Sequence, residues 1–193
     1  MIKKFNINKY LIHHPLNLLA TLAAISNFLD IKNLNKNIFY NYNLPTGRGD
    51  FFKKKIKNKI INIVDESYNS NPLSLEFAVR NFDSMKIKAH KKNILIGDML
   101  ELGKFSKKLH KQASNIINKS NINKVYVYGN HIKETFNKIK PQKRGRILNS
   151  KKQIFSLIKN DLKNKDYLMV KGSNATGLNK IISKIKLGQF NAI

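Results

Sequence analysis

The stretch Asp65-Glu66-Ser67-Tyr68-Asn69-Ser70-Asn71-Pro72 shows how this chain is organised. It follows the apolar run 60–64, at the centre of a strand predicted over residues 59–65. It ends in an asparagine that can cap a helix and a proline suited to the first helical position, so we expect a helix to about residue 85. A strand, a polar loop and a helix in this order are the repeating unit of an α/β protein.

The same unit recurs along the rest of the chain. Further strands are predicted over residues 93–96, 125–128, 146–148 and 167–170. The helices expected after them cover residues 106–118, 132–139, 151–158 and 175–185. Such alternation predicts parallel strands joined by right-handed helical crossovers, and therefore a doubly wound, mostly parallel α/β sheet.

The first 46 residues do not follow this pattern. Residues 15–29 predict an apolar helix with proline in its first turn, and residues 30–43 form a polar connection. The segment Leu44-Pro45-Thr46-Gly47-Arg48-Gly49 is dense in turn-forming residues and predicts a linker. We therefore expect two domains, over residues 1–46 and 47–193.

The composition limits the classes of protein to which the chain can belong. The 193 residues include no cysteine, which excludes disulfides and thiolate metal sites and suits a reducing cytoplasm. The longest apolar run, residues 16–29, is too short and too polar to span a bilayer. We expect no signal peptide, because no cleavable apolar segment follows the lysines of residues 1–10.

The formal net charge of +26 has two interpretations. A basic α/β module that binds nucleic acid is one of them. Lysine supplies most of this charge and is spread along the chain, whereas arginine, which dedicated binders use for bidentate contacts, occurs only at Arg48, Arg80, Arg144 and Arg146. We therefore favour compositional bias on solvated faces, and we expect no specific nucleic-acid partner.

Ligands of doubly wound sheets gather at the carboxyl ends of the strands, where this sequence places three polar turns. They are residues 65–71, residues 97–103 with Ser106 and His110 behind them, and residues 171–174. Helix capping alone also accounts for some of these side chains. The second turn is not a phosphate loop, because Gly97 and Gly103 are one residue too far apart and Phe105 replaces the required Ser or Thr.

Together, the three turns resemble motifs of the Mur ligases of peptidoglycan synthesis. The family's C-terminal domain has Asp-Asp/Glu-Ser-Tyr-Asn-Ala-Asn-Pro after a strand, then Gly-Asp-Met-Leu-Glu-Leu-Gly with a downstream Ser and His, then Val-Lys-Gly-Ser. Gly47-Arg48-Gly49 is similar to the family's linker arginine. His13-His14-Pro15-Leu16-Asn17, with Ala20, Ala23 and Ala24, resembles the helix that closes the central domain. The resemblance covers residues 12–186. It is strongest to the ligases of this family that add D-alanyl-D-alanine to UDP-N-acetylmuramoyl-tripeptide.

The resemblance implies an amide ligase that uses ATP and Mg²⁺, and it implies a role for each matching residue. Arg48 and Lys171 are the implied catalytic residues. The implied nucleotide contacts are Asn17 on the adenine, Arg48 on the phosphates, and Asp65 or Glu66 on the ribose. The implied contacts with the incoming dipeptide are Asn69, Asn71, Lys171 and Ser173. Asn174 stands where many relatives have arginine, so no carboxylate contact is expected there.

Other parts of such a ligase have no counterpart in this sequence. They are the domain that binds the UDP-sugar, the phosphate loop, the magnesium ligands and the modified lysine. We therefore expect no metal ligand on this chain and no catalysis by the chain alone. It is a fragment of a longer gene product, a subunit whose missing domains act in trans, or the product of a truncated gene.

Overall fold

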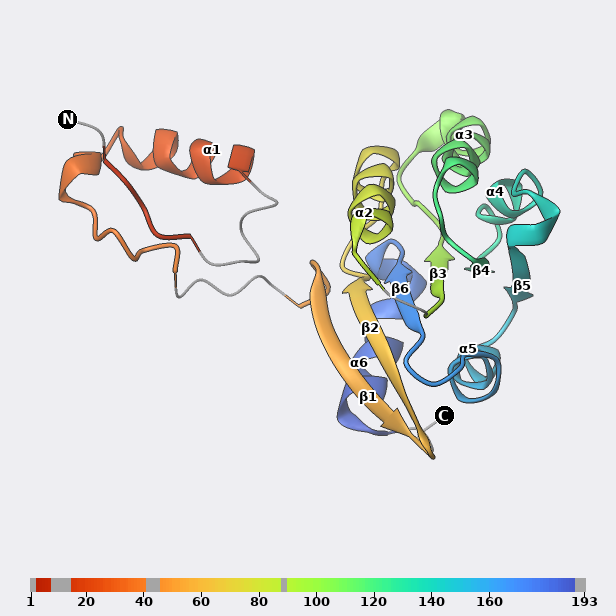
Figure 1. The fold of residues 1–193 in the computed structure, drawn as a ribbon. Helices are drawn as coiled ribbons and strands as arrows, with labels where there is room; N and C mark the ends of the chain where they lie inside the picture. The colour runs from red at the N-terminus through yellow and green to blue at the C-terminus, as the bar shows by residue number, and fades with distance from the viewer. Residues whose placement is uncertain (1–2, 8–14, 41–45, 88–89, 190–193) are drawn as a thin grey trace. The chain divides into compact units, whose positions relative to one another are not determined.

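The computed structural model describes residues 3–7, 15–40, 46–87 and 90–189 (Figure 1). The chain forms two compact units, Met1–Pro45 and Thr46–Ile193, which we describe separately. Among the residues of the predicted motifs, His13, His14, Leu44 and Pro45 lie outside the described part. The assignment of residues 1–46 to the C-terminal end of the ATP-binding central domain of a Mur ligase stays a prediction.

The N-terminal unit contains helix α1 (Pro15–Ile25) and a 3₁₀ turn, Ile31–Asn33. The helix is shorter than the predicted 15–29. The side chains of Ser26 and Asn27 bond to the carbonyl of Ala23, a local arrangement that competes with continuation of the helix. Apolar residues dominate α1, yet none of them is buried among the described residues, and Leu16 is 77% exposed.

The C-terminal unit is built on a six-stranded sheet in the order β1-β2-β6-β3-β4-β5. Its strands are β1 (Asp50–Ile56), β2 (Lys59–Glu66), β3 (Lys92–Gly97), β4 (Lys124–Tyr128), β5 (Arg144–Leu148) and β6 (Tyr167–Lys171). All neighbouring pairs are parallel except β1 and β2. The predicted doubly wound, mostly parallel α/β fold is therefore confirmed.

Helices cover both faces of this sheet (Figure 1). Buried residues of α2 (Pro72–Ser84), α3 (Ser106–Lys119) and α4 (Lys133–Phe136) pack in one core. Those of α5 (Lys151–Ser156) and α6 (Leu178–Leu187) pack in the other. Side chains alternate along β6, so Leu168 and Val170 enter the second core and Met169 the first.

Several element boundaries differ from the predictions for local reasons. Strand β1 was not predicted, because lysines interrupt the apolar alternation in this edge strand. Helix α4 covers only Lys133–Phe136 of the predicted 132–139, and α5 continues as a π-helical turn, Leu157–Asp161. Helix α6 begins at Leu178 rather than residue 175, because Gly177, with a φ of 74°, separates it from the 3₁₀ turn Asn174–Thr176.

Within residues 3–7, 15–40, 46–87 and 90–189, no helix is long and apolar enough to cross a membrane.

Candidate functional site

The three polar turns meet at the carboxyl edge of the sheet, where β2, β6 and β3 are neighbours. Buried Ser173, just after β6, connects all three. Its N–H donates to the carbonyl of Asp98 at 3.0 Å, and its hydroxyl donates to the carbonyl of Ser70 at 3.1 Å. The same hydroxyl accepts the N–H of Leu100 at 2.9 Å. Ser173 therefore fixes the turns to one another.

Lys171 and Glu66 form a charged pair at the ends of the neighbouring strands β6 and β2. The Lys171 ammonium lies 4.0 Å from a Glu66 carboxylate oxygen and donates a hydrogen bond of 2.9 Å to the carbonyl of Asn69. The Lys171 side chain is only 3% exposed, and that of Glu66 is 25% exposed. Burial lowers the pKa of Lys171 and raises the pKa of Glu66, while the opposite charge of each partner counters both shifts.

Asp65 has a different environment from Glu66, although the two are adjacent. Its buried carboxylate accepts hydrogen bonds from the Ser67 N–H at 3.0 Å and from the Ser67 hydroxyl at 2.5 Å. Burial raises the pKa of Asp65, while the bonds from Ser67 act to lower it. The Asp65 carboxylate thus closes the turn after β2, and the Glu66 carboxylate faces Lys171.

Arg48 reaches the same region from the linker that precedes β1. The linker is held against the turn after β2 by two backbone bonds, from Gly49 N–H to the Asp65 carbonyl at 2.9 Å and from Tyr68 N–H to the Gly47 carbonyl at 3.0 Å. The guanidinium of Arg48 lies 4.4 Å from the centre of the Tyr68 ring. The linker also approaches Glu66, because a Cβ atom on Gly49 would lie 3.5 Å from a Glu66 carboxylate oxygen. The charge of Arg48 acts to lower the pKa of both Glu66 and Lys171.

Asn69 and Asn71 take part in local structure through their side chains. Asn71 is the cap of α2: its amide oxygen accepts the N–H of Ser74 at 2.8 Å, and the Ser74 hydroxyl accepts the N–H of Asn71 at 3.0 Å. The side-chain oxygen of Asn69 accepts the N–H of Ser70 at 2.8 Å. Asn69 remains exposed on the loop whose carbonyl holds Lys171.

A hollow of about 530 Å³ lies beside these turns. Two of the predicted site residues, Asn69 and Ser173, border it. The sequence analysis assigns no role to two other lining residues, Tyr68 and Lys180. An aromatic ring in an otherwise polar loop could have indicated Tyr68, whereas Lys180 resembles the many other lysines of the chain. The full lining is Tyr68, Asn69, Leu100, Glu101, Ser173, Asn174, Ala175, Gly177 and Lys180.

The polar residues of the second turn support its backbone. Fully buried His110 donates from Nδ1 to the Ser106 carbonyl at 2.8 Å and accepts the N–H of Met99 at Nε2, at 3.1 Å. Burial lowers the pKa of His110, in keeping with a neutral ring that accepts one bond and donates the other. Asp98 accepts the N–H groups of Asn130 and Ile132 at 3.0 and 2.7 Å. The Asp98 carboxylate and the His110 imidazole therefore stabilise the backbone of this turn.

Asn17, the predicted adenine contact, lies on α1 in the N-terminal unit and is exposed. Its carbonyl accepts the hydroxyl of Thr21 at 2.8 Å. In the part of the chain that the structure describes, no three His, Cys, Asp or Glu side chains come together in a group that could hold a metal ion.

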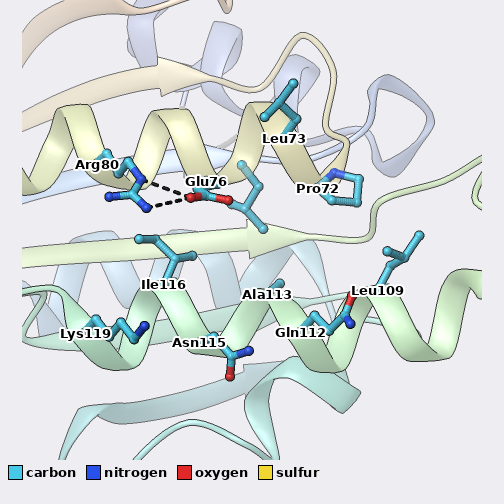
Figure 2. Close-up of a pocket in the computed structure, with 11 residues that line it drawn as sticks. Pro72, Leu73, Glu76, Arg80, Leu109, Gln112, Ala113, Asn115, Ile116 and Lys119 are labelled. Atoms are coloured by element: carbon cyan, nitrogen blue, oxygen red, sulfur yellow. Dashed lines mark hydrogen bonds and ion pairs between the residues drawn. The ribbon is translucent and has the colours of Figure 1, made fainter.

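A second hollow, of about 490 Å³, lies between helices α2 and α3 (Figure 2). Ala113 and Ile116 of α3 line it, and the carboxylate of Glu76 binds the guanidinium of Arg80 across one turn of α2. None of the predicted site residues lines this hollow. We assign the candidate site to the carboxyl edge of the sheet.

Curated proteins similar to this chain include ligases from several bacteria. A UDP-N-acetylmuramoyl-tripeptide--D-alanyl-D-alanine ligase of Buchnera aphidicola subsp. Acyrthosiphon pisum is 32% identical over 133 residues, which are 66% of this chain and 27% of that protein. The protein of the same name from Bacillus subtilis is 27% identical over 128 residues, or 65% of this chain and 28% of its own length. The chain thus spans little more than a quarter of these relatives and matches their C-terminal portion.

Solved structures show the same fold. The MurF ligase from Thermotoga maritima in complex with ADP superposes with a TM-score of 0.66 at 21% identity, covering 90% of this chain and 38% of that one. A MurF structure from Acinetobacter baumannii gives a TM-score of 0.65 at 17% identity, covering 84% and 35% of the two chains.

The match to a family domain agrees with the order of the motifs along the chain. Residues 47–174 match the domain described as Mur ligase, glutamate ligase domain, which is more than half of the chain and includes all three turns of the carboxyl edge. The chain therefore belongs to the Mur ligase family.

Proposed function

We propose that this chain is the C-terminal part of an ATP-dependent ligase that joins D-alanyl-D-alanine to UDP-N-acetylmuramoyl-tripeptide in peptidoglycan synthesis. In this proposal the chain closes over the bound nucleotide. The names of the Buchnera and Bacillus relatives support the choice of substrates. The observation that carries the proposal is the grouping of Arg48, Glu66 and Lys171 at the edge of the sheet where α/β proteins bind ligands, with the Arg48 linker bonded to the turn after β2.

The charged groups suit a nucleotide. Arg48 is exposed and offers its N–H donors to phosphate oxygens, a contact that suits a guanidinium. Ribose hydroxyls need a carboxylate acceptor that is free to receive them. Because the Asp65 carboxylate is engaged by Ser67, we assign the ribose contact to Glu66. The adenine contact of Asn17 is part of the same proposal.

The proposed reaction activates the tripeptide carboxylate by transfer of the terminal phosphoryl group of ATP. The amine of D-alanyl-D-alanine then attacks the acyl phosphate, the amide bond forms, and inorganic phosphate leaves. Arg48 stabilises the charge that develops on the transferring phosphoryl group. We assign no Mg²⁺ ligand to this chain, and Mg²⁺ enters the proposal as the ion that accompanies ATP.

Lys171 is the second proposed catalytic residue, and its surroundings define what it can do. Its ammonium is buried and held by the Asn69 carbonyl and Glu66, so it reaches the dipeptide only when the Asn69 loop moves on domain closure. Until then it adds positive charge beneath the site. Asn69 and Ser173 border the hollow proposed for the dipeptide, and Asn71 supports it by capping α2.

The proposal makes the chain a lid for a site completed by other domains. The N-terminal unit is then the end of the central, ATP-binding domain. Helix α1 supports this, because an apolar helix with no buried residue needs further structure to cover it. The missing domains come from a longer gene product or from a partner chain. We place the reaction in the cytoplasm, consistent with a chain that lacks cysteine.

An assay of phosphate release tests the proposal. This chain is joined to the N-terminal and central domains of the Bacillus relative, and ATP, the tripeptide precursor and D-alanyl-D-alanine are supplied. We expect release only when all three substrates are present. The chain alone, and the added domains alone, should not exceed the no-enzyme control. Release by the chain alone, or a folded but inactive joined protein, contradicts the proposal.

A further inference from the structure

The backbone around Arg48 is held in place on both sides. Gly47 and Gly49 have φ angles of 82° and 91°, a left-handed conformation that glycine adopts readily. Their bonds to Tyr68 N–H and to the Asp65 carbonyl fix the linker to the turn after β2. Contact is so close that a Cβ atom on Gly47 would lie 2.9 Å from the Tyr68 nitrogen. The Cα atom of Arg48 therefore has a defined position above this turn.

The side chain of Arg48 lies against the ring of Tyr68. In residues 3–7, 15–40, 46–87 and 90–189, we find no hydrogen bond or ion pair to its guanidinium, and the Tyr68 ring lies 4.4 Å away. A cation over an aromatic face is attracted by the ring, while the guanidinium N–H groups stay available. The contact thus limits where the guanidinium lies without using its donors.

The Tyr68 ring is also part of the site. It is 42% exposed and borders the hollow of about 530 Å³ together with Asn69 and Ser173. Its backbone N–H anchors the linker, and its ring receives the Arg48 side chain. One residue therefore connects the linker, the arginine and the hollow.

We propose that Tyr68 is a positioning residue that holds the Arg48 guanidinium at the edge of the candidate site, in a position to bind phosphate. This inference rests on the proposed function, because that function supplies the phosphate that Arg48 binds. Tyr68 acts through Arg48 and does not itself contact the reacting atoms.

The first test uses the 193-residue chain itself. The aromatic ring should shift the NMR signals of the Arg48 side chain upfield. We expect Tyr68→Leu to abolish this shift and Tyr68→Phe to keep it. Arg48 signals that are unchanged in Tyr68→Leu would show that the contact is absent and would overturn the inference.

The second test uses the joined enzyme of the previous section. Tyr68→Leu should lower kcat about two- to fivefold, the range expected for an exposed cation–π contact. Tyr68→Phe should restore the rate. In an Arg48→Ala background, Tyr68→Leu should have no further effect, because the group that it positions is gone.

Phe105→Leu is the matched control. Phe105 is an exposed ring on the turn after β3, with the Lys104 ammonium 5.5 Å from its centre, and its loss should leave kcat unchanged. A severe loss in Arg48→Ala with a wild-type rate in Tyr68→Leu, or with fully additive losses, overturns the positioning role and leaves the proposed function intact. A wild-type rate in Arg48→Ala overturns the proposed function and the inference with it.

Discussion

Asp65 and Glu66 are adjacent carboxylates with different tasks because side chains alternate along a strand. Asp65 turns toward Ser67 and closes the loop, whereas Glu66 turns toward Lys171. The sequence left open which of the two serves a ribose. The choice depends on which face of β2 each side chain occupies at the strand end, and an acidic pair alone does not reveal it.

The raised pKa of Asp65 predicts a dependence of stability on pH. The folded chain holds this proton more tightly than the unfolded chain, whose ordinary value is 3.8. Stability from this group is therefore fully present below pH 3.8 and is lost as pH rises through the higher folded pKa. Urea unfolding between pH 3.5 and about 7 should show the free energy of unfolding of wild type falling relative to that of Asp65→Asn.

Glu76→Gln, which removes an exposed carboxylate of α2, controls for the loss of one negative charge elsewhere in the unit. If the free energy of unfolding of wild type minus that of Asp65→Asn stayed constant or rose over this range, folding would not raise the pKa of Asp65.

The other site residues were predictable to different degrees. Lys171 and Ser173 could be placed at the carboxyl edge because an apolar strand ends just before them. That Ser173 bonds to two other turns depends on contacts across about 70 to 100 residues, which no local pattern encodes. The contact between Tyr68 and Arg48 likewise depends on the antiparallel return from β1 to β2.

Among the elements, the linker before β1 is the most constrained by its glycines. It turns sharply at Gly47 and Gly49 and then enters an edge strand that sequence patterns missed. In β1, Phe52 packs against the core and Ile56 is buried, while Lys53 and Lys55 point to solvent. The alternation is broken at the half-buried Lys54, between Phe52 and Ile56, and at the exposed Phe51, so the sequence pattern did not predict the strand.

The structure predicts that two glycine substitutions differ in cost. Gly47→Ala combines a left-handed φ with a contact of 2.9 Å to backbone, whereas Gly177→Ala has a similar φ and nothing within 4 Å. We expect Gly177→Ala to lower the free energy of unfolding by about 1 kcal/mol and Gly47→Ala by about 2 kcal/mol or more. Urea denaturation of the two variants measures this difference, and equal losses would argue against the close packing of the linker on Tyr68.

Central elements were predicted better than peripheral ones. Strands β2, β3, β4 and β6 agree with their predicted ranges to within one residue at each end, because apolar residues dominate them and their central positions are buried. The short helix α4 and the start of α6 were placed less well. There, turns and the left-handed Gly177 determine the boundary more than apolar spacing does.

For the whole chain, the motifs near the ends of the buried strands identify the fold and the family. They do not by themselves establish the activity of the chain. The chain spans 27–28% of the curated relatives described above. Its N-terminal unit presents an apolar helix with no buried residue among those described. The proposed role as the lid of a larger enzyme accounts for both observations.

The central claim is that this chain brings Arg48 to a transferring phosphoryl group, and the rate of ligation by the joined enzyme carrying Arg48→Ala tests it most directly. The account predicts a loss of about a hundredfold or more, because the guanidinium stabilises charge in the transition state. Arg146→Ala, which removes an arginine paired with Asp161 at 2.6 Å, should keep a near-native rate. A near-native rate for Arg48→Ala in an active joined enzyme would contradict the account.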